Sequence, residues 1–242
     1  MKKIYVTLMF FVGFATGANA QGFTFGPKAG FGASGINNAN INSAAAEAGQ
    51  SVFRSNDSFI VSFKAGVFAE WRFNRFFGVS PEVVYSRQGT PSISFRSFYV
   101  GHQNTYYLAT YTNSKVRLDY INVPVLVKIY PFRGLRIDLG PQAGFLTAVK
   151  IWDEAAVSAY KGCFRRVDLS LCMGLTIDFT RHIFLQGRYN LGLTDISRTT
   201  TSAGTAFVIG NGKKVTNRAT QFSLGYRFGS DGIYSPRHAP YD

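Results

Sequence analysis

The three histidines are the residues best suited to acid–base chemistry, and each lies in a segment that holds a side chain poorly. His102 falls in a long polar connection, His182 in a tight turn and His238 near the end of the chain. A Ser/His/carboxylate arrangement needs its members fixed on rigid elements. The sequence therefore predicts no catalytic residues and no enzymatic activity.

Metal and cofactor chemistry is predicted to be absent as well. Asp153 and Glu154 form a lone acidic pair in a loop, and His, Cys, Asp and Glu are not grouped at the spacing of metal ligands. The stretch "GPKAGFGASG" (26–35) shares glycines with a phosphate loop but has no Lys-Ser/Thr ending or following helix. We expect no metal site and no cofactor-binding residues.

Cys163 and Cys172 could form a disulfide in an exported chain. The residues from 165 onward follow a strand pattern, however. At about 3.3 Å per residue this places the two sulfurs roughly 20 Å apart or more, so free thiols are predicted.

Residues 1–20 read as a signal peptide. A positive start, an apolar stretch over 4–17 and the small residues Ala18, Asn19 and Ala20 precede Gln21. The apolar stretch is shorter than the roughly 20 residues of a membrane-spanning helix. Export is therefore favoured over a membrane anchor.

The net charge of +13 raises the question of a nucleic-acid partner. Export and the scattering of basic residues along the chain argue against one. We expect the neighbours to be outer-membrane lipid and lipopolysaccharide, attracted by charge, with other envelope proteins as further candidates and the chain itself a monomer.

Residues 134–150, "GLRIDLGPQAGFLTAVK", place most of their apolar side chains on one side of an extended chain and the charged ones on the other. Strand side chains point alternately to opposite faces, so this segment separates an oily face from a charged one. The oily face holds Leu135, Ile137, Leu139, Pro141, Ala143, Phe145 and Val149; the other holds Arg136, Asp138, Gln142 and Lys150.

The same alternation predicts eight strands. Tight turns around 74–75, 132–134 and 180–182 alternate with long connections at 34–57, 88–114, 151–164 and 195–217. A change of phase near Tyr120 indicates a bulge. The predicted strands are 22–34, 58–73, 76–89, 115–132, 134–150, 165–180, 183–196 and 218–228.

A soluble sandwich or a lipocalin-like barrel would bury the oily face, but neither requires short and long connections to alternate. The strands also exceed the usual five or six residues and suit a tilted membrane span. The prediction is all-β, an eight-stranded antiparallel up-and-down transmembrane β-barrel in the outer membrane, with short periplasmic turns and long extracellular loops. The barrel is expected over 21–228, followed by a periplasmic C-terminal tail over 229–242.

This orientation places charges of both signs in the lumen. A three-residue link ending at Gly134 would set Pro131 opposite Leu135 and Lys128 opposite Asp138. A plug of ion pairs is favoured over a proton or ion path, because eight strands leave an interior that side chains fill. The other inward residues are Lys28, Lys64, Glu70, Arg72, Glu82, Arg136, Asp178 and Arg188.

Four segments resemble the PorT-like outer-membrane β-barrel family of Bacteroidetes-type bacteria. They are "PEVVYSRQG" (81–89), "LDYINVPVLVKIY" (118–130), "GLRIDLGPQAGFL" (134–146) and "YNLGLTDI" (189–196). The resemblance implies a barrel in the outer membrane and suggests, through the family's namesake, a link to type IX protein secretion. It implies no site residues.

The predicted function is a structural or surface-interaction role through the long loops. These contain Tyr106, Tyr107, Tyr111 and Trp152 among small polar residues, a composition that suits recognition and equally describes ordinary solvated loops. The alternative is an accessory role in protein secretion or surface assembly. A narrow channel or a lipid-modifying enzyme ranks below both.

Overall fold

The computed structural model describes residues 22–38, 59–100, 106–152, 163–202, 205–209 and 214–230. In this part of the chain, no helix has the length and apolar character of a membrane span. The strands are β1 (Gly22–Asn37), β2 (Ile60–Arg72), β3 (Phe77–Val100), β4 (Tyr106–Phe132), β5 (Leu135–Trp152), β6 (Val167–Asp178), β7 (Ile183–Gly192), β8 (Thr200–Ser202), β9 (Thr205–Ile209), β10 (Thr216–Tyr226) and β11 (Phe228–Ser230).

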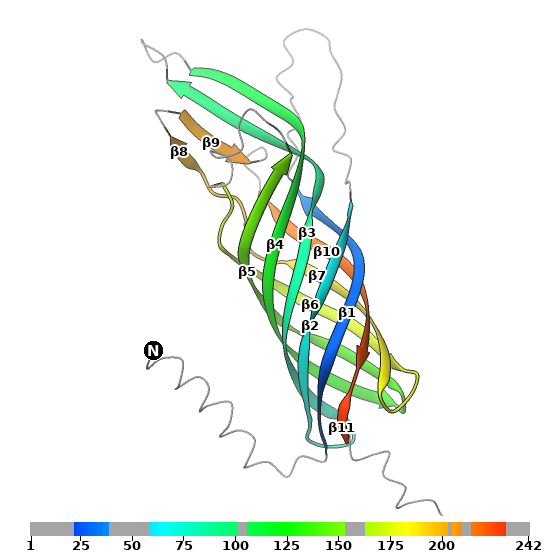
Figure 1. Cartoon of the computed structure of the whole chain (residues 1–242). Helices are drawn as coiled ribbons and strands as arrows, with labels where there is room; N and C mark the ends of the chain where they lie inside the picture. Colours follow the sequence, from blue (N-terminus) through cyan, green and yellow to red (C-terminus); the bar gives the residue numbers. More distant parts are fainter. Residues whose placement is uncertain are drawn as a thin grey trace, which may run out of the picture.

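Eight strands form a closed antiparallel barrel, as predicted (Figure 1). Strands β1 to β7 pair in chain order, β10 pairs with β7, and β1 pairs with β10 to complete the circle. This closing contact runs from Lys28 opposite Gly225 to Asn37 opposite Thr216. β11 continues it along Phe23–Phe25, so the last strand ends at Ser230.

The charged faces of the strands point inward and the oily faces outward. On β5, Arg136 and Asp138 are 2% and 1% exposed, whereas Leu139 and Phe145 are 44% and 46% exposed. Large apolar side chains exposed this extensively on every wall strand suit contact with lipid. Aromatic residues at the short-turn end, where an interfacial belt is expected, are Trp71, which is half-buried, and the exposed Phe73, Phe77, Phe132, Phe179 and Phe228.

A bulge on β5 inverts the two faces near its outer end. Asp119 pairs with Ala148 but Tyr120 pairs with Leu146, which leaves Thr147 as the extra residue. The shift lies at Tyr120 as predicted, yet the added residue is on β5. The prediction was therefore wrong for Val149, which packs inward, and for Lys150, which is exposed.

The β4–β5 turn is tighter than predicted. Arg133 and Gly134 form it, with Gly134 at φ 81°, and Phe132 pairs with Leu135. An irregularity between Ile129 and Phe132 absorbs one residue. The predicted pairing of Pro131 with Leu135 is thus wrong, whereas Lys128 opposite Asp138 is confirmed.

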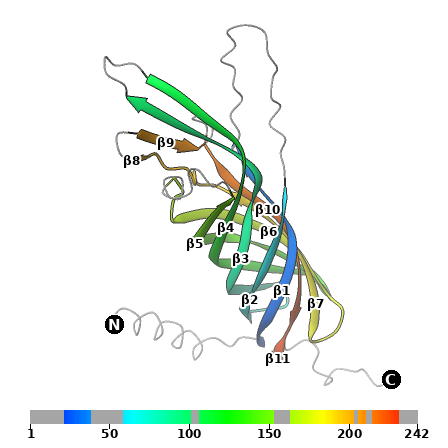
Figure 2. The same cartoon turned by 45° about the horizontal axis from the view of Figure 1, so that its top comes forward.

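Two of the predicted long loops contain strands that rise beyond the barrel. β3 and β4 stay paired to Val100 and Tyr106, and β9 pairs with β3 between Phe95 and Tyr99 (Figure 2). β8 then pairs with β9. The expectation of loops over 88–114 and 195–217 was wrong for the parts that form strands. In these parts the backbone hydrogen-bond ladder continues, although the sequence lacks the alternating apolar face from which strands were predicted.

Candidate functional site

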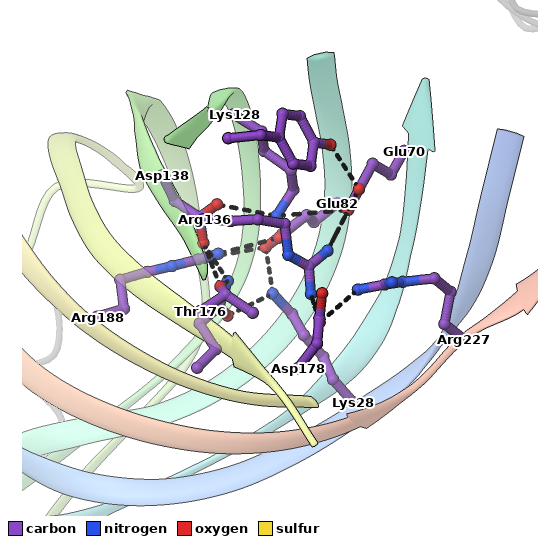
Figure 3. Close-up of polar contacts among 12 residues, drawn as sticks. Lys28, Glu70, Glu82, Lys128, Arg136, Asp138, Thr176, Asp178, Arg188 and Arg227 are labelled. Carbon is purple, nitrogen blue, oxygen red and sulfur yellow. Dashed lines mark hydrogen bonds and ion pairs between the residues drawn. The ribbon is translucent and has the colours of Figure 1, made fainter. Parts of the chain in front are cut away.

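The lumen near the three short turns is filled by charged side chains, shown in Figure 3. The prediction that they face inward is confirmed, since the residues below are at most 8% exposed. They come from β1 to β5 and β7, and the acidic group of Asp178 on β6 joins them. The set is Lys28, Lys64, Glu70, Arg72, Glu82, Lys128, Arg136, Asp138 and Arg188.

Glu82 is the anion of the first cluster. Both Arg188 terminal nitrogens donate to its two oxygens at 2.9 Å, and Lys28 Nζ lies 2.6 Å from Oε2. Lys28 also donates to Gln186 Oε1 at 3.1 Å. This bidentate geometry with a further cation is a strong form of buried ion pair.

Arg136 links two further carboxylates. Its Nη1 lies 3.0 Å from Glu70 Oε2, and its Nη2 contacts Asp178. Asp178 also accepts from Arg227 at 2.9 Å, and Glu70 accepts from the hydroxyl of Tyr130 at 2.7 Å. The guanidinium is thus held from both sides.

Asp138 closes the network beside its predicted partner. Lys128 Nζ lies 2.9 Å from Oδ1, which confirms the ion pair expected from the strand register. The second oxygen, Oδ2, accepts from Thr176 Oγ1 at 2.8 Å and from Gln186 Nε2 at 2.6 Å.

These contacts tie together strands that are not neighbours in the wall. Arg136 on β5 reaches Glu70 on β2, and Arg188 on β7 reaches Glu82 on β3. Such pairs cross the lumen and fill it, as expected for eight strands. The geometry matches the predicted ion-pair plug.

Amide and hydroxyl groups occupy the next layer. Asn122 Nδ2 donates to Ser86 Oγ at 2.6 Å, and Gln142 Nε2 donates to Ser170 Oγ at 3.1 Å. Cys172 Sγ lies 3.3 Å from Gln142 Oε1. Both cysteines are buried free thiols, as predicted.

An apolar cluster closes the end of the lumen opposite the short turns. Val116, Leu118 and Tyr120 project inward from β4, each at most 1% exposed. The bulge on β5 directs Val149 and Ile151 toward them. The other members are Ile36, Leu146, Cys163, Phe164, Ile196 and Val215.

The chain beside this cluster is ordered by Asp195. Its Oδ1 accepts from the amide and hydroxyl of Ser197 at 2.9 and 2.7 Å and from the amide of Val215 at 3.1 Å. Partial burial alone would raise the pKa of Asp195, but these hydrogen bonds hold the pKa below its ordinary value.

The remaining candidate residues that the structure describes lie in the β6–β7 turn and on β4 and β5. His182 lies in the β6–β7 turn, with Nδ1 3.0 Å from Arg227 O and its ring stacked on Tyr226. Among the described residues, no three His, Cys, Asp or Glu are grouped to hold a metal. Tyr106, Tyr107 and Tyr111 lie on β4 and Trp152 ends β5, while His102, Asp153, Glu154 and His238 fall outside the described residues.

Sequence reasoning placed Thr176, Gln186 and Arg227 on the polar faces of their strands but did not identify them as partners of the ion-pair network. It missed Tyr130, which shares the strand parity of Lys128, and that signal alone could have found it. The apolar cluster has no such signal, because it joins six separate parts of the chain.

Comparison with known proteins gives one family and several distant structures. A model described as the outer membrane protein beta-barrel domain matches residues 5–198. No curated protein sequence matches the chain.

Among solved structures, Ail of Yersinia pestis is 13% identical at a TM-score of 0.39, covering 86% of this chain and 99% of its own. Neisserial surface protein A is 13% identical at a TM-score of 0.39, and the match covers 86% of this chain and 96% of that protein. OprG of Pseudomonas aeruginosa is 13% identical at a TM-score of 0.40, and the match covers 88% of this chain and 98% of that protein.

Proposed function

Because the chain belongs to the outer membrane protein beta-barrel domain family and resides in the outer membrane, we propose that it is a non-enzymatic barrel with a structural or surface-interaction role. The filled lumen is the observation that carries this proposal. Ion pairs cross the barrel between β2 and β5 and between β3 and β7, and an apolar cluster lies beyond them. A barrel filled in this way supports an anchoring role rather than a transport role.

The contact region is the sheet that rises beyond the barrel. β3 and β4 have 24 and 27 residues, more than twice the roughly 9 to 11 that a membrane span requires. β9 and β8 widen the same sheet. Short turns face the periplasm in such barrels, so this sheet projects outside the cell. We call β8, β9 and the paired ends of β3 and β4 (93–100 and 106–114) the outer sheet.

Shortening the outer sheet tests its role. Ile93 pairs with Ser114, so residues 94–113 can be replaced by Asn-Gly, which favours a two-residue hairpin turn. The shortened barrel should still fold and show altered mobility on unheated gels, but should lose cross-links to neighbouring surface proteins on intact cells. An unchanged cross-linking pattern would remove the outer sheet from the proposed function.

The absence of conduction is tested separately. Purified barrel in planar bilayers should give no steady ion current, because paired side chains cross the lumen. Stable single-channel steps would instead support a narrow channel.

We further propose that the partners are outer-membrane lipid and lipopolysaccharide, with other envelope proteins as candidates and no nucleic acid. Exposed apolar side chains on the wall and the positive net charge support contact with lipid and with anionic head groups.

The chain is proposed to be a monomer. Mass measurement of the barrel in native-like nanodiscs checks this, since a single chain per disc is expected even at high protein loading.

The second candidate is an accessory factor in protein secretion or surface assembly. It rests on the PorT-like resemblance of 81–89, 118–130, 134–146 and 189–196, which fall on β3, β4 and β5 and at β7. All four segments build the barrel, so they support shared ancestry more than shared activity. Deletion of the gene would decide, because this candidate requires loss of secreted proteins from the cell surface. A lipid-modifying enzyme ranks below both candidates.

A further inference from the structure

Lys64 is the one lysine ammonium in the described part of the lumen that no hydrogen bond satisfies. The residue lies on β2 and is 2% exposed, and its Nζ has no hydrogen-bond partner among the described residues. Burying a charge without a partner is costly. The position therefore calls for a counter-charge.

The surrounding side chains do not supply that charge. The charged groups acting on Lys64 are Arg188, Lys28 and Glu82. Glu82 is already engaged by the other two, since Arg188 occupies both of its oxygens and Lys28 contacts Oε2. Lys64, Lys28 and Arg188 thus lie around Glu82. Arg188 is also attracted by Asp138, but Asp138 is already paired with Lys128, so positive charge is in excess around Lys64.

Neutral donors without partners lie across β1 from Lys64. In the strand register, Gly30 lies between Lys64 on β2 and Ser223 on β10. Gly32 lies in the same way between Ser62 and Gln221. Ser62 Oγ, Ser223 Oγ and Gln221 Nε2 are buried and have no hydrogen-bond partner among the described residues.

The two glycines leave no side chain on β1 between these groups. A Cβ added to Gly30 would lie 1.9 Å from Phe222 O, and one added to Gly32 would lie 2.0 Å from Thr220 O. At Gly30 and Gly32 the backbone of β10 therefore lies too close to β1 for a side chain on the inner face. Neighbouring strands are only about 4.8 Å apart, so the inner side chains of β2 and β10 face each other over the glycines.

We propose that this glycine trough binds one small inorganic anion of the halide class. The trough is defined by Gly30 and Gly32, with Lys64 and Ser62 on one side and Ser223 and Gln221 on the other. The ammonium supplies the counter-charge, and the two hydroxyls and the amide donate hydrogen bonds. Arg188 and Lys28 add positive potential beyond the first contacts. The narrow lumen of an eight-stranded barrel restricts the ligand to a compact ion.

Bromide provides a direct test on the unaltered protein. Barrel refolded and crystallised in bromide should give an anomalous-scattering peak within hydrogen-bonding distance of Lys64 Nζ. A trough that contains only ordered water, with no anomalous peak, would overturn the proposal.

Refolding in different anions provides an independent test in solution. At constant ionic strength, the urea midpoint of unfolding should be higher in chloride than in gluconate, which is too large for the trough. Lys64→Met keeps the length of the side chain and relieves repulsion from Lys28 and Arg188, so it should fold but lose this chloride dependence. Ser223→Ala should weaken the apparent chloride affinity about tenfold, the effect of one hydrogen bond to a charged group.

Ser80→Ala is the matched control. Ser80 is another buried lumen serine without a partner among the described residues, but it is six residues from Ser86, the β3 partner of Lys64. The urea midpoint of Ser80→Ala should depend on chloride as strongly as that of the wild type. Equal midpoints in chloride and gluconate for the wild type, or an undiminished chloride effect in Lys64→Met, would refute the assignment.

Discussion

Replacing Glu82 by Gln should destabilise the barrel severely. The substitution keeps the size of the side chain but removes the one carboxylate that Arg188 and Lys28 share, each within 3 Å. All three side chains are almost completely buried, with 1–2% of their surface exposed. Removing one partner of a buried ion pair costs about 3 to 5 kcal/mol, and two cations lose their partner here.

The assay is urea unfolding of barrel refolded in lipid vesicles, followed by mobility on unheated gels. The control is Arg87→Gln, because Arg87 lies 3.5 Å from Asp119 and is 44% exposed, and an exposed pair contributes under about 1 kcal/mol. Changing Glu82 and Arg188 together to Leu should recover part of the loss. Equal losses for Glu82→Gln and Arg87→Gln would refute the view that the buried lumen charges depend on one another.

Three further predictions concern the faces, the thiols and the outer end. Leu139→Arg should cost about 2 to 4 kcal/mol by placing a charge against lipid, and Gln142→Arg should cost less; the reverse order in urea unfolding would mean that the faces are inverted. Cys163 and Cys172 should resist maleimide in the folded barrel and react in urea, as mass spectrometry would show, because both are buried; labelling of the folded barrel would contradict their placement. The lowered pKa of Asp195 stabilises the fold above the ordinary pKa of about 4, and this contribution is lost as the pH falls through the lower folded value. Protease sensitivity of the outer end should therefore rise at acid pH, and in Asp195→Asn it should already be raised at neutral pH.

The barrel and its ion pairs could be predicted because strand parity is a local property. Once Leu139 is assigned to the outer face, Asp138 and Gln142 must face inward. The Lys128–Asp138 pair followed from hairpin register in the same way, and it survived an error at Pro131 because the irregularity lies beyond Ile129.

The outer end could not be predicted because its determinants are not local. Thr147 shifts the faces of β5 because the ladder between β4 and β5 skips it, and nothing in the residue itself marks it as the extra residue of a bulge. The cluster around Val116 and Leu118 draws Ile36, Phe164 and Val215 from distant segments. The extension of β3 to Val100 depends on cross-strand pairing rather than on an apolar pattern.

The contact between β1 and β10 also determines when the barrel can form. These strands begin at Gly22 and Thr216, so the wall cannot close until nearly the whole chain has left the ribosome and crossed the inner membrane. Pairing over such a sequence separation makes folding slow, because the entropy of a very long loop is lost before the contact forms. Until then the outward apolar faces remain unshielded in water, and the chain is prone to aggregate. A chain cut before Thr216 should therefore be unable to complete the barrel and should be a substrate for degradation.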